Sequence, residues 1–313
     1  MSDQKIAFLF PGQGSQAVGM GRDLAEKFTV ARDTFAQADE ALGYPLSKLC
    51  FEGPIEQLKQ TEFTQPAIFA VSMAAYRVLA SRGIQPQIVA GHSLGEYAAC
   101  AASGVMSFED AIRALQSRGR FMQEAVPEGQ GAMAAVLGLD ADAVRGACEA
   151  AARETSQVVS PANLNSPDQI VISGSAAGVA RASELAKERG AKKVVPLQVS
   201  APFHCALMQP AQDRLAEVLK EIEVSDPRFP VVSNVTADVT KKGGRERDLL
   251  IEQVTAPVRW VESMRRMIDE GASTFVEVGP GRVLSGLLRQ IDRGQKCMNV
   301  EDSVSLEKAL AGN

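Results

Sequence analysis

Cysteine is scarce in this sequence, and its spacing excludes two kinds of site. The 313-residue chain has five cysteines, and no two of them form a Cys-x-x-Cys pair. An odd number of widely spaced cysteines supports neither a zinc site nor a disulfide framework. We therefore expect no metal, and we expect reduced thiols in a reducing compartment.

Long apolar segments and a concentrated positive charge are also absent. No run approaches the roughly 18 apolar residues that a membrane helix needs. Pro11 interrupts the apolar run near the N-terminus, which is too short for a signal peptide. The net charge of −5 is spread along the chain, whereas nucleic-acid binding needs a concentrated basic face. We therefore expect a cytoplasmic protein with no nucleic-acid or membrane partner.

Strands and helices alternate along most of the chain, and the hydrophobic fraction of 45% is ample for a large core. This alternation predicts an α/β protein with a mostly parallel sheet covered on both faces. The expected strands are 6–10, 88–90, 231–235 and 273–278, and the expected helices are 64–80, 96–102, 107–126, 254–270 and 283–291. We interpret the polar stretch 241–248 as a solvated loop.

Residues 127–199 follow a different order. Strands at 132–139, 157–161, 169–174 and 193–199, with helices at 140–153 and 176–189, give β-α-β-β-α-β, the arrangement of a ferredoxin-like unit. We expect this unit to be a small subdomain inserted into a larger unit formed by residues 1–126 and 200–313. A cleft is expected between the two.

Ser93 stands between Gly91 and Gly95, directly after an apolar strand and before a helix. This is the context of the Gly-x-Ser-x-Gly elbow, in which a sharp turn exposes a nucleophilic serine. The glycines leave room for the neighbouring strand and helix, and the helix N-terminus stabilises nearby negative charge. The alternative is a glycine-rich turn in which the serine is incidental.

A nucleophilic serine needs a base, and the sequence has only two histidines, His92 and His204. His92 is adjacent to Ser93 in the turn, where neighbouring side chains point in different directions, so it cannot easily accept the serine proton. His204 lies where the chain returns from the small subdomain and is the candidate base; the alternative is a core histidine bonded to the backbone. No acid is singled out to orient this histidine, and a backbone carbonyl could accept its Nδ1 hydrogen instead.

Arg118 falls in the middle of the apolar face of the helix that starts at Ser107, at about 100° per residue. A buried guanidinium without a partner is strongly unfavourable, so Arg118 must meet an anion, and its fork geometry suits a carboxylate. The partner is either an internal Asp or Glu or a carboxylate that the substrate brings. The second case would select a dicarboxylic half-ester over a monocarboxylic acyl group.

The loop after the first strand has two glycines, Gly12 and Gly14. Gly19 comes too late for the dinucleotide pattern Gly-x-Gly-x-x-Gly, which argues against nucleotide binding. A tight loop at the end of a strand can instead offer a backbone N–H. We expect the N–H groups of Gln13 and Leu94 to form an oxyanion hole.

Eight segments together resemble the malonyl-CoA:acyl-carrier-protein transacylases of bacterial type II fatty-acid synthesis. Each alone is weak evidence, but they occur in the family's order between about residues 5 and 290. They are FPGQGSQ (10–16), GHSLGE (91–96), QSRGR (116–120), GAM (131–133), SPANLNSP (160–167), APFH (201–204), PVRW (257–260) and EVGPG (277–281).

The resemblance implies an α/β-hydrolase-like core with an inserted ferredoxin-like subdomain. It implies Ser93 as the nucleophile, His204 as the base and Arg118 as the clamp on the malonyl carboxylate. It also implies the N–H groups of Gln13 and Leu94 as oxyanion donors.

Four further positions follow from the same resemblance. The main-chain carbonyl of Gln253 is the group that would hold the catalytic histidine. Met122, Phe203 and Asn163 are expected to contact the substrate, and the bulk of Phe203 disfavours a branched methylmalonyl group.

The implied reaction is a ping-pong transfer of malonyl from malonyl-CoA to the phosphopantetheine thiol of acyl carrier protein, without a metal or redox cofactor. Carrier proteins of this type are acidic, so we expect docking on local basic residues and an otherwise monomeric enzyme. Two other functions remain open: a free-standing polyketide acyltransferase of the same chemistry, and a serine thioesterase or hydrolase, which would not need Arg118. A scaffold protein with a vestigial site is a third class. The candidate docking residues are Lys192, Lys193, Arg265 and Arg266.

Overall fold

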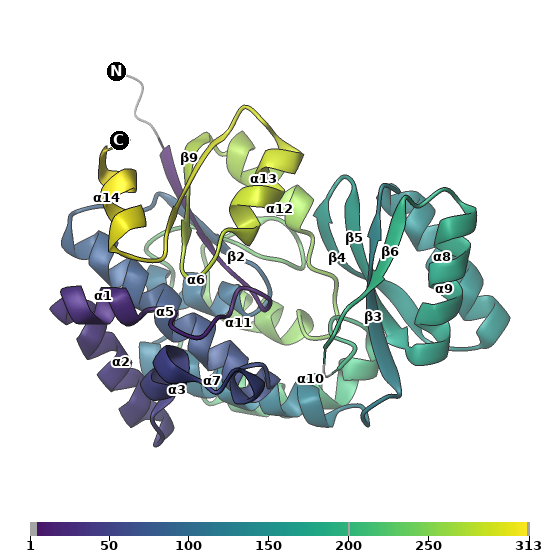
Figure 1. Ribbon diagram of the computed structural model, residues 1–313, viewed down its shortest axis with the longest axis horizontal. Coiled ribbons are helices and arrows are strands. Elements are labelled where there is room, and N and C mark those ends of the chain that lie inside the picture. The colour runs from purple at the N-terminus through teal and green to yellow at the C-terminus, as the bar shows by residue number, and fades with distance from the viewer. Residues whose placement is uncertain (1–4, 200, 312–313) are drawn as a thin grey trace.

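Two separate β-sheets organise the computed structural model, which describes residues 5–199 and 201–311 (Figure 1). The larger sheet has the order β10-β9-β1-β2-β7-β8. Its strands run parallel, except that β8 is antiparallel to β7. The mostly parallel sheet predicted from the alternating pattern is therefore confirmed. Its strands are β1 (Lys5–Phe10), β2 (Ile88–Gly91), β7 (Val231–Val232), β8 (Val239–Thr240), β9 (Ala272–Val278) and β10 (Lys296–Val300).

Helices cover both faces of this sheet, because successive side chains of a strand point to opposite sides. In β1, Phe8 and Phe10 join the hydrophobic cluster that includes α5 and α7, whereas Ala7 and Leu9 join the cluster around Trp260 of α12. The helices of this part of the chain are α1 (Arg22–Lys27), α2 (Thr29–Leu42), α3 (Leu46–Glu52), α4 (Ile55–Leu58), α5 (Thr61–Ser81), α6 (Gly95–Ser103), α7 (Phe108–Glu124), the 3-10 turn η1 (Ala206–Met208), α10 (Gln209–Lys220), α11 (Gly243–Glu252), α12 (Trp260–Asp269), α13 (Val283–Ile291) and α14 (Ser303–Ala311).

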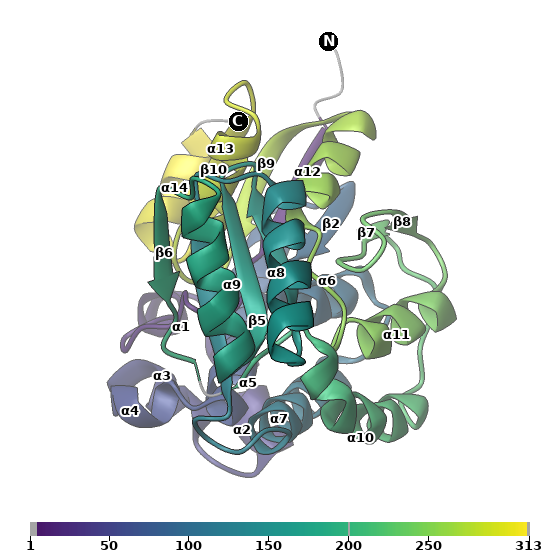
Figure 2. The same ribbon diagram turned by 90° about the vertical axis from the view of Figure 1, so that its right-hand side faces the viewer.

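The smaller sheet is antiparallel and has the order β4-β5-β3-β6. Two helices, α8 and α9, cover one of its faces (Figure 2). The opposite face, with Met133 and Val171, belongs to the same hydrophobic cluster as Phe203 of the larger unit. The chain order is the predicted β-α-β-β-α-β: β3 (Gly131–Leu137), α8 (Ala141–Thr155), β4 (Val159–Ser166), β5 (Gln169–Ser175), α9 (Ala176–Glu188) and β6 (Lys193–Pro196). Ser200, where we expected the chain to return to the larger unit, lies outside the described residues.

A short backbone link joins β4 of the smaller sheet to the segment before α12. Val258, just before α12, donates from its N–H to the Ala162 carbonyl of β4 at 2.8 Å, and Leu164 donates back to the Val258 carbonyl at 2.9 Å. Asn163, between these two strand residues, is paired with Val258 as an isolated bridge. One wall of the space between the sheets is therefore fixed by main-chain hydrogen bonds.

The solvated loop predicted at residues 241–248 is wrong, because most of this stretch belongs to α11. Its sequence is densely polar and has two glycines, but Glu246, Leu249 and Leu250 form a fully buried face. Gly243 has a packing role, since a Cβ there would lie 2.2 Å from the carbonyl oxygen of Ser225. A buried glutamate in the apolar face concealed the helical periodicity.

Other element boundaries also differ from the prediction. The helix expected over 254–270 begins only at Trp260, because Pro257 lies in the irregular segment before it. The strand expected at 157–161 starts at Val159 and continues to Ser166, and the strand expected at 193–199 ends at Pro196. Strand β10 and helix α14 were not predicted.

The turn between β2 and α6 depends on glycine at two positions. A Cβ on Gly91 would lie 1.9 Å from the carbonyl carbon and oxygen of Gly95, and a Cβ on Gly95 would lie 2.2 Å from the carbonyl oxygen of Phe10. Real Cβ atoms do not approach backbone this closely. The turn, β1 and β2 are thus packed against one another without room for any side chain.

We predict that Gly91→Ala or Gly95→Ala lowers the free energy of unfolding by about 3 kcal/mol or more, the scale of severe core overpacking. Thermal denaturation followed by circular dichroism measures this loss. Gly286→Ala in α13 is the matched control: a Cβ there meets nothing within 4 Å, so the change should be neutral or slightly stabilising. Equal melting temperatures for the three variants would contradict the prediction.

Candidate active site

Ser93 sits at the tip of the turn between β2 and α6 in a strained conformation. Its φ is 52°, a left-handed value that is uncommon for a residue other than glycine. Such strain persists only where the surroundings hold it. Asn234 supplies that support, because its Oδ1 accepts from the Ser93 N–H at 2.7 Å and its Nδ2 donates to the Gly91 carbonyl at 2.7 Å.

His204 lies beside this serine and is almost completely buried, with 3% of its surface exposed. Its Nε2 is 2.8 Å from Ser93 Oγ, and its Nδ1 is 2.9 Å from the carbonyl oxygen of Gln253. A carbonyl oxygen only accepts, so Nδ1 carries the hydrogen and Nε2 presents its lone pair to the serine hydroxyl. This is the geometry that a general base requires.

The charge state of His204 follows from its surroundings. Burial, and then the positive charge of Arg118, lower the pKa of His204 to about 3. The imidazole is therefore neutral at physiological pH, with Nε2 free to accept a proton.

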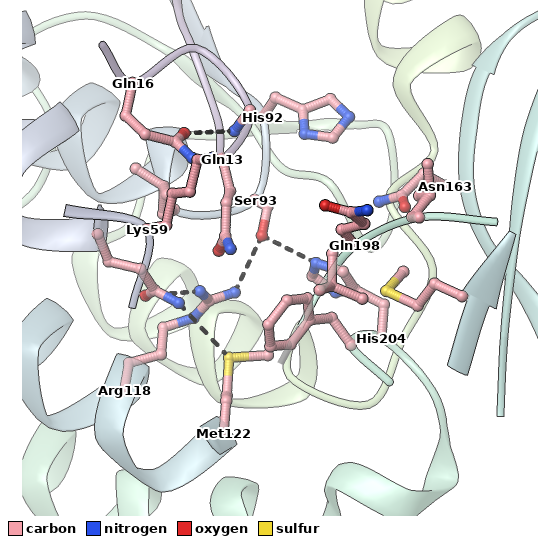
Figure 3. Close-up of a pocket in the computed structure, with 17 residues that line it drawn as sticks. Gln13, Gln16, Lys59, His92, Ser93, Arg118, Met122, Asn163, Gln198 and His204 are labelled. Carbon is pink, nitrogen blue, oxygen red and sulfur yellow. Dashed lines mark hydrogen bonds between the residues drawn. The ribbon is translucent and has the colours of Figure 1, made fainter. Parts of the chain in front are cut away.

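Arg118 is buried on α7 with 1% exposure, in the middle of the face predicted to be apolar. Its partners are neutral: Nη1 donates to Gln65 Oε1 at 2.8 Å, and Nη2 donates to Gln253 Oε1 at 2.8 Å. Nη2 also donates to Ser93 Oγ at 3.1 Å (Figure 3). Its Nε is buried without a hydrogen-bond partner among the described residues. The guanidinium thus contacts the serine while no hydrogen bond joins it to a carboxylate of the described chain.

Gly119 explains how Gln65 reaches Arg118. A Cβ at this position would lie 2.6 Å from the Thr61 carbonyl oxygen, so helices α5 and α7 approach each other closely here. The Gln65 Nε2 also lies 3.8 Å from the sulfur of Met122, one turn along α7. The close approach allows one amide to span the two helices.

Gln253 connects most of the site through its side chain as well as its carbonyl. Its Nε2 donates to Glu96 Oε2 at 2.6 Å and to the Ser93 carbonyl at 3.1 Å, while its Oε1 accepts from Arg118. The sequence analysis pointed only to the main-chain carbonyl of this residue. It missed Asn234 as well, although a polar residue two positions beyond β7, at the carboxyl end of a parallel strand, was an available signal.

A cavity of about 410 Å³ lies between the two sheets, with Ser93 and His204 in its wall. The cavity brings together Ser93, His204, Arg118, Gln13, Leu94, Met122, Phe203 and Asn163, which are all the expected site residues except Gln253. Gln253 is fully buried behind Ser93 and His204. Leu94 follows the serine directly as the N-cap of α6, and Gln13, in the loop after β1, lines the same cavity.

His92, the other histidine, is held away from the serine proton. Its Nε2 is 2.8 Å from Asn165 Oδ1, and its ring lies against Trp260 with centroids 5.3 Å apart. A side chain on Gly12 would approach its carbonyl oxygen at 2.7 Å, so the glycine loop after β1 packs directly on this turn.

Two negative findings apply to residues 5–199 and 201–311. No three or more His, Cys, Asp or Glu side chains are grouped so that they could hold a metal ion. No helix in this part of the chain has the length and apolar character needed to cross a membrane.

The lowered pKa of His204 predicts an unusual pH profile for the reactivity of Ser93. Modification by a serine-directed sulfonyl fluoride should keep its rate from neutral pH down to roughly pH 5, because a base with a pKa of about 3 stays unprotonated there. An ordinary histidine would lose this reactivity around its pKa of about 6.5. The rate of modification, followed by mass spectrometry, measures the profile, with His204→Ala as the unreactive control. A midpoint near the ordinary value would refute the prediction.

Comparison with known proteins places this site in a family. The family model described as "Acyl transferase domain" matches residues 7–308. A malonyl CoA-acyl carrier protein transacylase of Bacillus subtilis is 50% identical over 306 residues, covering 98% of this chain and 96% of the relative.

Solved structures agree with the sequence comparison. The crystal structure of an acyl carrier protein S-malonyltransferase from Vibrio cholerae has a TM-score of 0.95 and 48% identity, and the match covers 98% of this chain and 100% of that one. A malonyl-transacylase in complex with its type II PKS acyl-carrier protein has a TM-score of 0.96 and 47% identity, with 99% and 100% coverage. This chain therefore belongs to the malonyl-CoA:acyl-carrier-protein transacylase family of acyl transferases.

Proposed function

We propose that this protein transfers the malonyl group from malonyl-CoA to the phosphopantetheine thiol of an acyl carrier protein through a malonyl-serine ester. The function serves fatty-acid synthesis and needs no metal or redox cofactor. Membership of the family supports the activity, and the arrangement around Ser93 supports the roles of individual residues.

One observation carries the choice of malonyl as the acyl group. Arg118 is a buried cation that contacts Ser93 Oγ at 3.1 Å and hydrogen-bonds only neutral groups among the described residues. A cation in a dry site attracts an anion strongly, and a guanidinium matches a carboxylate in bidentate geometry. The free carboxylate of malonyl, two bonds beyond the reacting carbonyl, supplies that anion beside the serine. The internal acid that the sequence left open as a partner is not among the hydrogen-bond partners of Arg118.

The first half-reaction acylates the serine. Nε2 of His204 accepts the Ser93 proton as Oγ bonds to the thioester carbon, and the negative charge on the carbonyl oxygen meets the N–H groups of Gln13 and Leu94. The carbon–sulfur bond then breaks, and His204 returns its proton to the CoA sulfur. The Gln253 carbonyl keeps the imidazole in the required tautomer throughout. Met122, Phe203 and Asn163 complete the walls around the acyl group.

The malonyl carboxylate also assists His204. After burial, the positive charge of Arg118 is the main cause that lowers the pKa of this histidine. A carboxylate paired with Arg118 cancels that charge, so binding of malonyl raises the basicity of His204 at the moment it is needed. Selectivity for a dicarboxylic acyl group therefore acts on the rate of acylation as well as on binding.

The second half-reaction returns the acyl group to a thiol. The phosphopantetheine sulfur attacks the ester after giving its proton to His204, and Ser93 regains that proton as the ester bond breaks. Transfer rather than hydrolysis requires that water be kept from the ester. Arg118 contributes by holding the malonyl group closed over the serine. A thioesterase would have no use for this clamp.

The identity of the carrier protein is a separate question. The similar structure that contains a type II PKS acyl-carrier protein favours a second candidate, the same chemistry on a polyketide carrier. In either case we propose that an acidic carrier docks on basic residues, for which Lys192, Lys193, Arg265 and Arg266 are the candidates. Arg266 already pairs with Asp238 and Glu270 on the surface, so it is the least available of the four.

We also propose two organisational features. The chain divides into a catalytic core of residues 1–126 and 200–313 and a small subdomain of residues 127–199, which the two separate sheets support. The enzyme works in the cytoplasm, which five thiols without disulfide bonds suit, four of them buried.

We predict that the wild-type protein incubated with radiolabelled malonyl-CoA acquires one covalent label, and that Ser93→Ala acquires none. The reason is that the Ser93 hydroxyl contacts the imidazole of His204 and also lines the cavity. Intact-protein mass spectrometry measures the ester, and addition of holo acyl carrier protein should remove it without releasing free malonate. Release of malonate instead of malonyl carrier protein would identify a hydrolase.

We predict that Arg118→Ala lowers malonyl transfer by roughly 10²- to 10⁴-fold, since loss of a buried charge pair is worth about 3–5 kcal/mol. Acetyl transfer, which has no carboxylate to pair, should fall far less. Steady-state transfer to carrier protein from the two CoA esters gives both values. Arg120→Ala, on the exposed side of the same helix, is the matched control and should behave as wild type. Equal losses for malonyl and acetyl would mean that Arg118 is structural.

A further inference from the structure

Two buried glutamates lie behind the catalytic residues and have no role in the reaction as written above. Glu96 is on α6 and Glu246 is on α11, and both side chains are fully buried. The two carboxyl groups interact directly through their side chains. Two carboxylates in contact within a dry interior cannot both be ionised, because their like charges repel strongly. We call Glu96 and Glu246 the glutamate pair.

The hydrogen bonds of the glutamate pair indicate a shared proton. Glu96 Oε2 accepts from Gln253 Nε2 at 2.6 Å and from the Asn234 N–H at 3.1 Å, while Glu246 Oε2 accepts from the Thr240 hydroxyl. Glu96 Oε1 is buried and has no donor among the described side chains and backbone groups. A proton between this oxygen and the carboxyl of Glu246 satisfies both residues.

The thiol and the phenol beside the pair add no negative charge, and burial raises the pKa of both glutamates. Burial raises the pKa of the Cys100 thiol, which donates to Glu246 Oε1 at 3.6 Å, and burial raises the pKa of the Tyr97 phenol, so both stay neutral. The cations nearby are Arg118 and, toward the surface, Arg245. Burial, and then repulsion from Glu246, raise the pKa of Glu96 well above its ordinary value.

Gln253 connects this charge to the catalytic base. Its side-chain amide donates to Glu96 at 2.6 Å, and its main-chain carbonyl accepts from His204 Nδ1 at 2.9 Å. We propose that the glutamate pair holds one shared proton and one negative charge, and that this charge stabilises the imidazolium formed when His204 takes the Ser93 proton.

The pair thus supplies the electrostatic part of what the acid does in a Ser-His-Asp triad, whereas the Gln253 carbonyl supplies the orientation. Arg118 makes this negative charge necessary, because protonation of His204 would otherwise place a second positive charge in a buried site that already has one. The pair touches no reacting atom, so Glu96 and Glu246 are positioning residues. This inference rests on the proposed function.

Glutamine variants separate the shared charge from the hydrogen bonds. In Glu96→Gln or Glu246→Gln, the glutamine N–H replaces the shared proton and the remaining glutamate ionises, so one charge persists. Each single variant should therefore keep its kcat within a few-fold of wild type. The double variant E96Q/E246Q has nearly the same shape and no charge. Its kcat should fall by roughly 10²-fold, the lower range of what a general base contributes.

Two further readouts distinguish this role from a structural one. The double variant should lose kcat with malonyl-CoA and at least as much with acetyl-CoA, because His204 acts on both and acetyl brings no carboxylate to offset the charge of Arg118. KM for malonyl-CoA should not rise, since Arg118 no longer has a competing negative charge nearby. A kcat close to wild type in the double variant, single losses that multiply to the double loss, or a raised KM at unchanged kcat would each overturn the proposal. A wild-type protein that does not transfer malonyl would instead reject the proposed function.

Two controls separate a loss of catalysis from a loss of folding. Glu277→Gln changes another buried glutamate, which accepts from the N–H groups of Leu284 and Ser285, and should lower the melting temperature without lowering kcat. If the double variant does not fold, infrared difference spectra of wild type against each single variant still test for the shared proton. The carboxylic-acid C=O band of the shared proton should be present in wild type at neutral pH and lost in both single variants. No such band in the difference spectra would overturn the proposal.

Discussion

A buried guanidinium beside a serine hydroxyl is the constraint on which this site depends. Arg118 is surrounded by amide and hydroxyl oxygens rather than by carboxylates, and it keeps its charge because arginine does not lose its proton in proteins. These neutral partners satisfy the buried guanidinium well enough for the protein to fold, and they leave its charge available to bind an anion. Helix α7 supplies the position, and the close approach to α5 at Gly119 supplies one of the two amides that hold the charge.

The same cation limits the base next to it. A histidine that is buried beside a positive charge is a weak proton acceptor, so the site needs compensation when chemistry occurs. Malonyl brings one negative charge of its own, and the interior holds another on the glutamate pair. In the proposed mechanism, such a site reacts well only when the correct acyl group is present, which couples recognition to rate through charge.

The sequence predicted the parts of this protein that depend on local pattern. The glycine–serine turn, the arginine within an apolar helical face and the split order of the small sheet are each visible in a few residues. The network behind them was not visible, because Gln65, Asn234 and Glu96 come from segments far apart in the chain and share no spacing rule. Helix α11 was missed for a related reason. Glu246, on its buried side, belongs to that network, and in a sequence a glutamate indicates an exposed position.

The main-chain link between β4 and the segment before α12 has a consequence for how new specificities arise. Since Ala162 and Leu164 are tied to Val258 by two backbone bonds, that side of the cavity has a fixed width whatever side chains it carries. A variant of this chain that accepts a larger acyl group would have to gain space through smaller side chains, not by moving the two sheets apart. The fold therefore confines the evolution of substrate choice to a few side chains facing the serine.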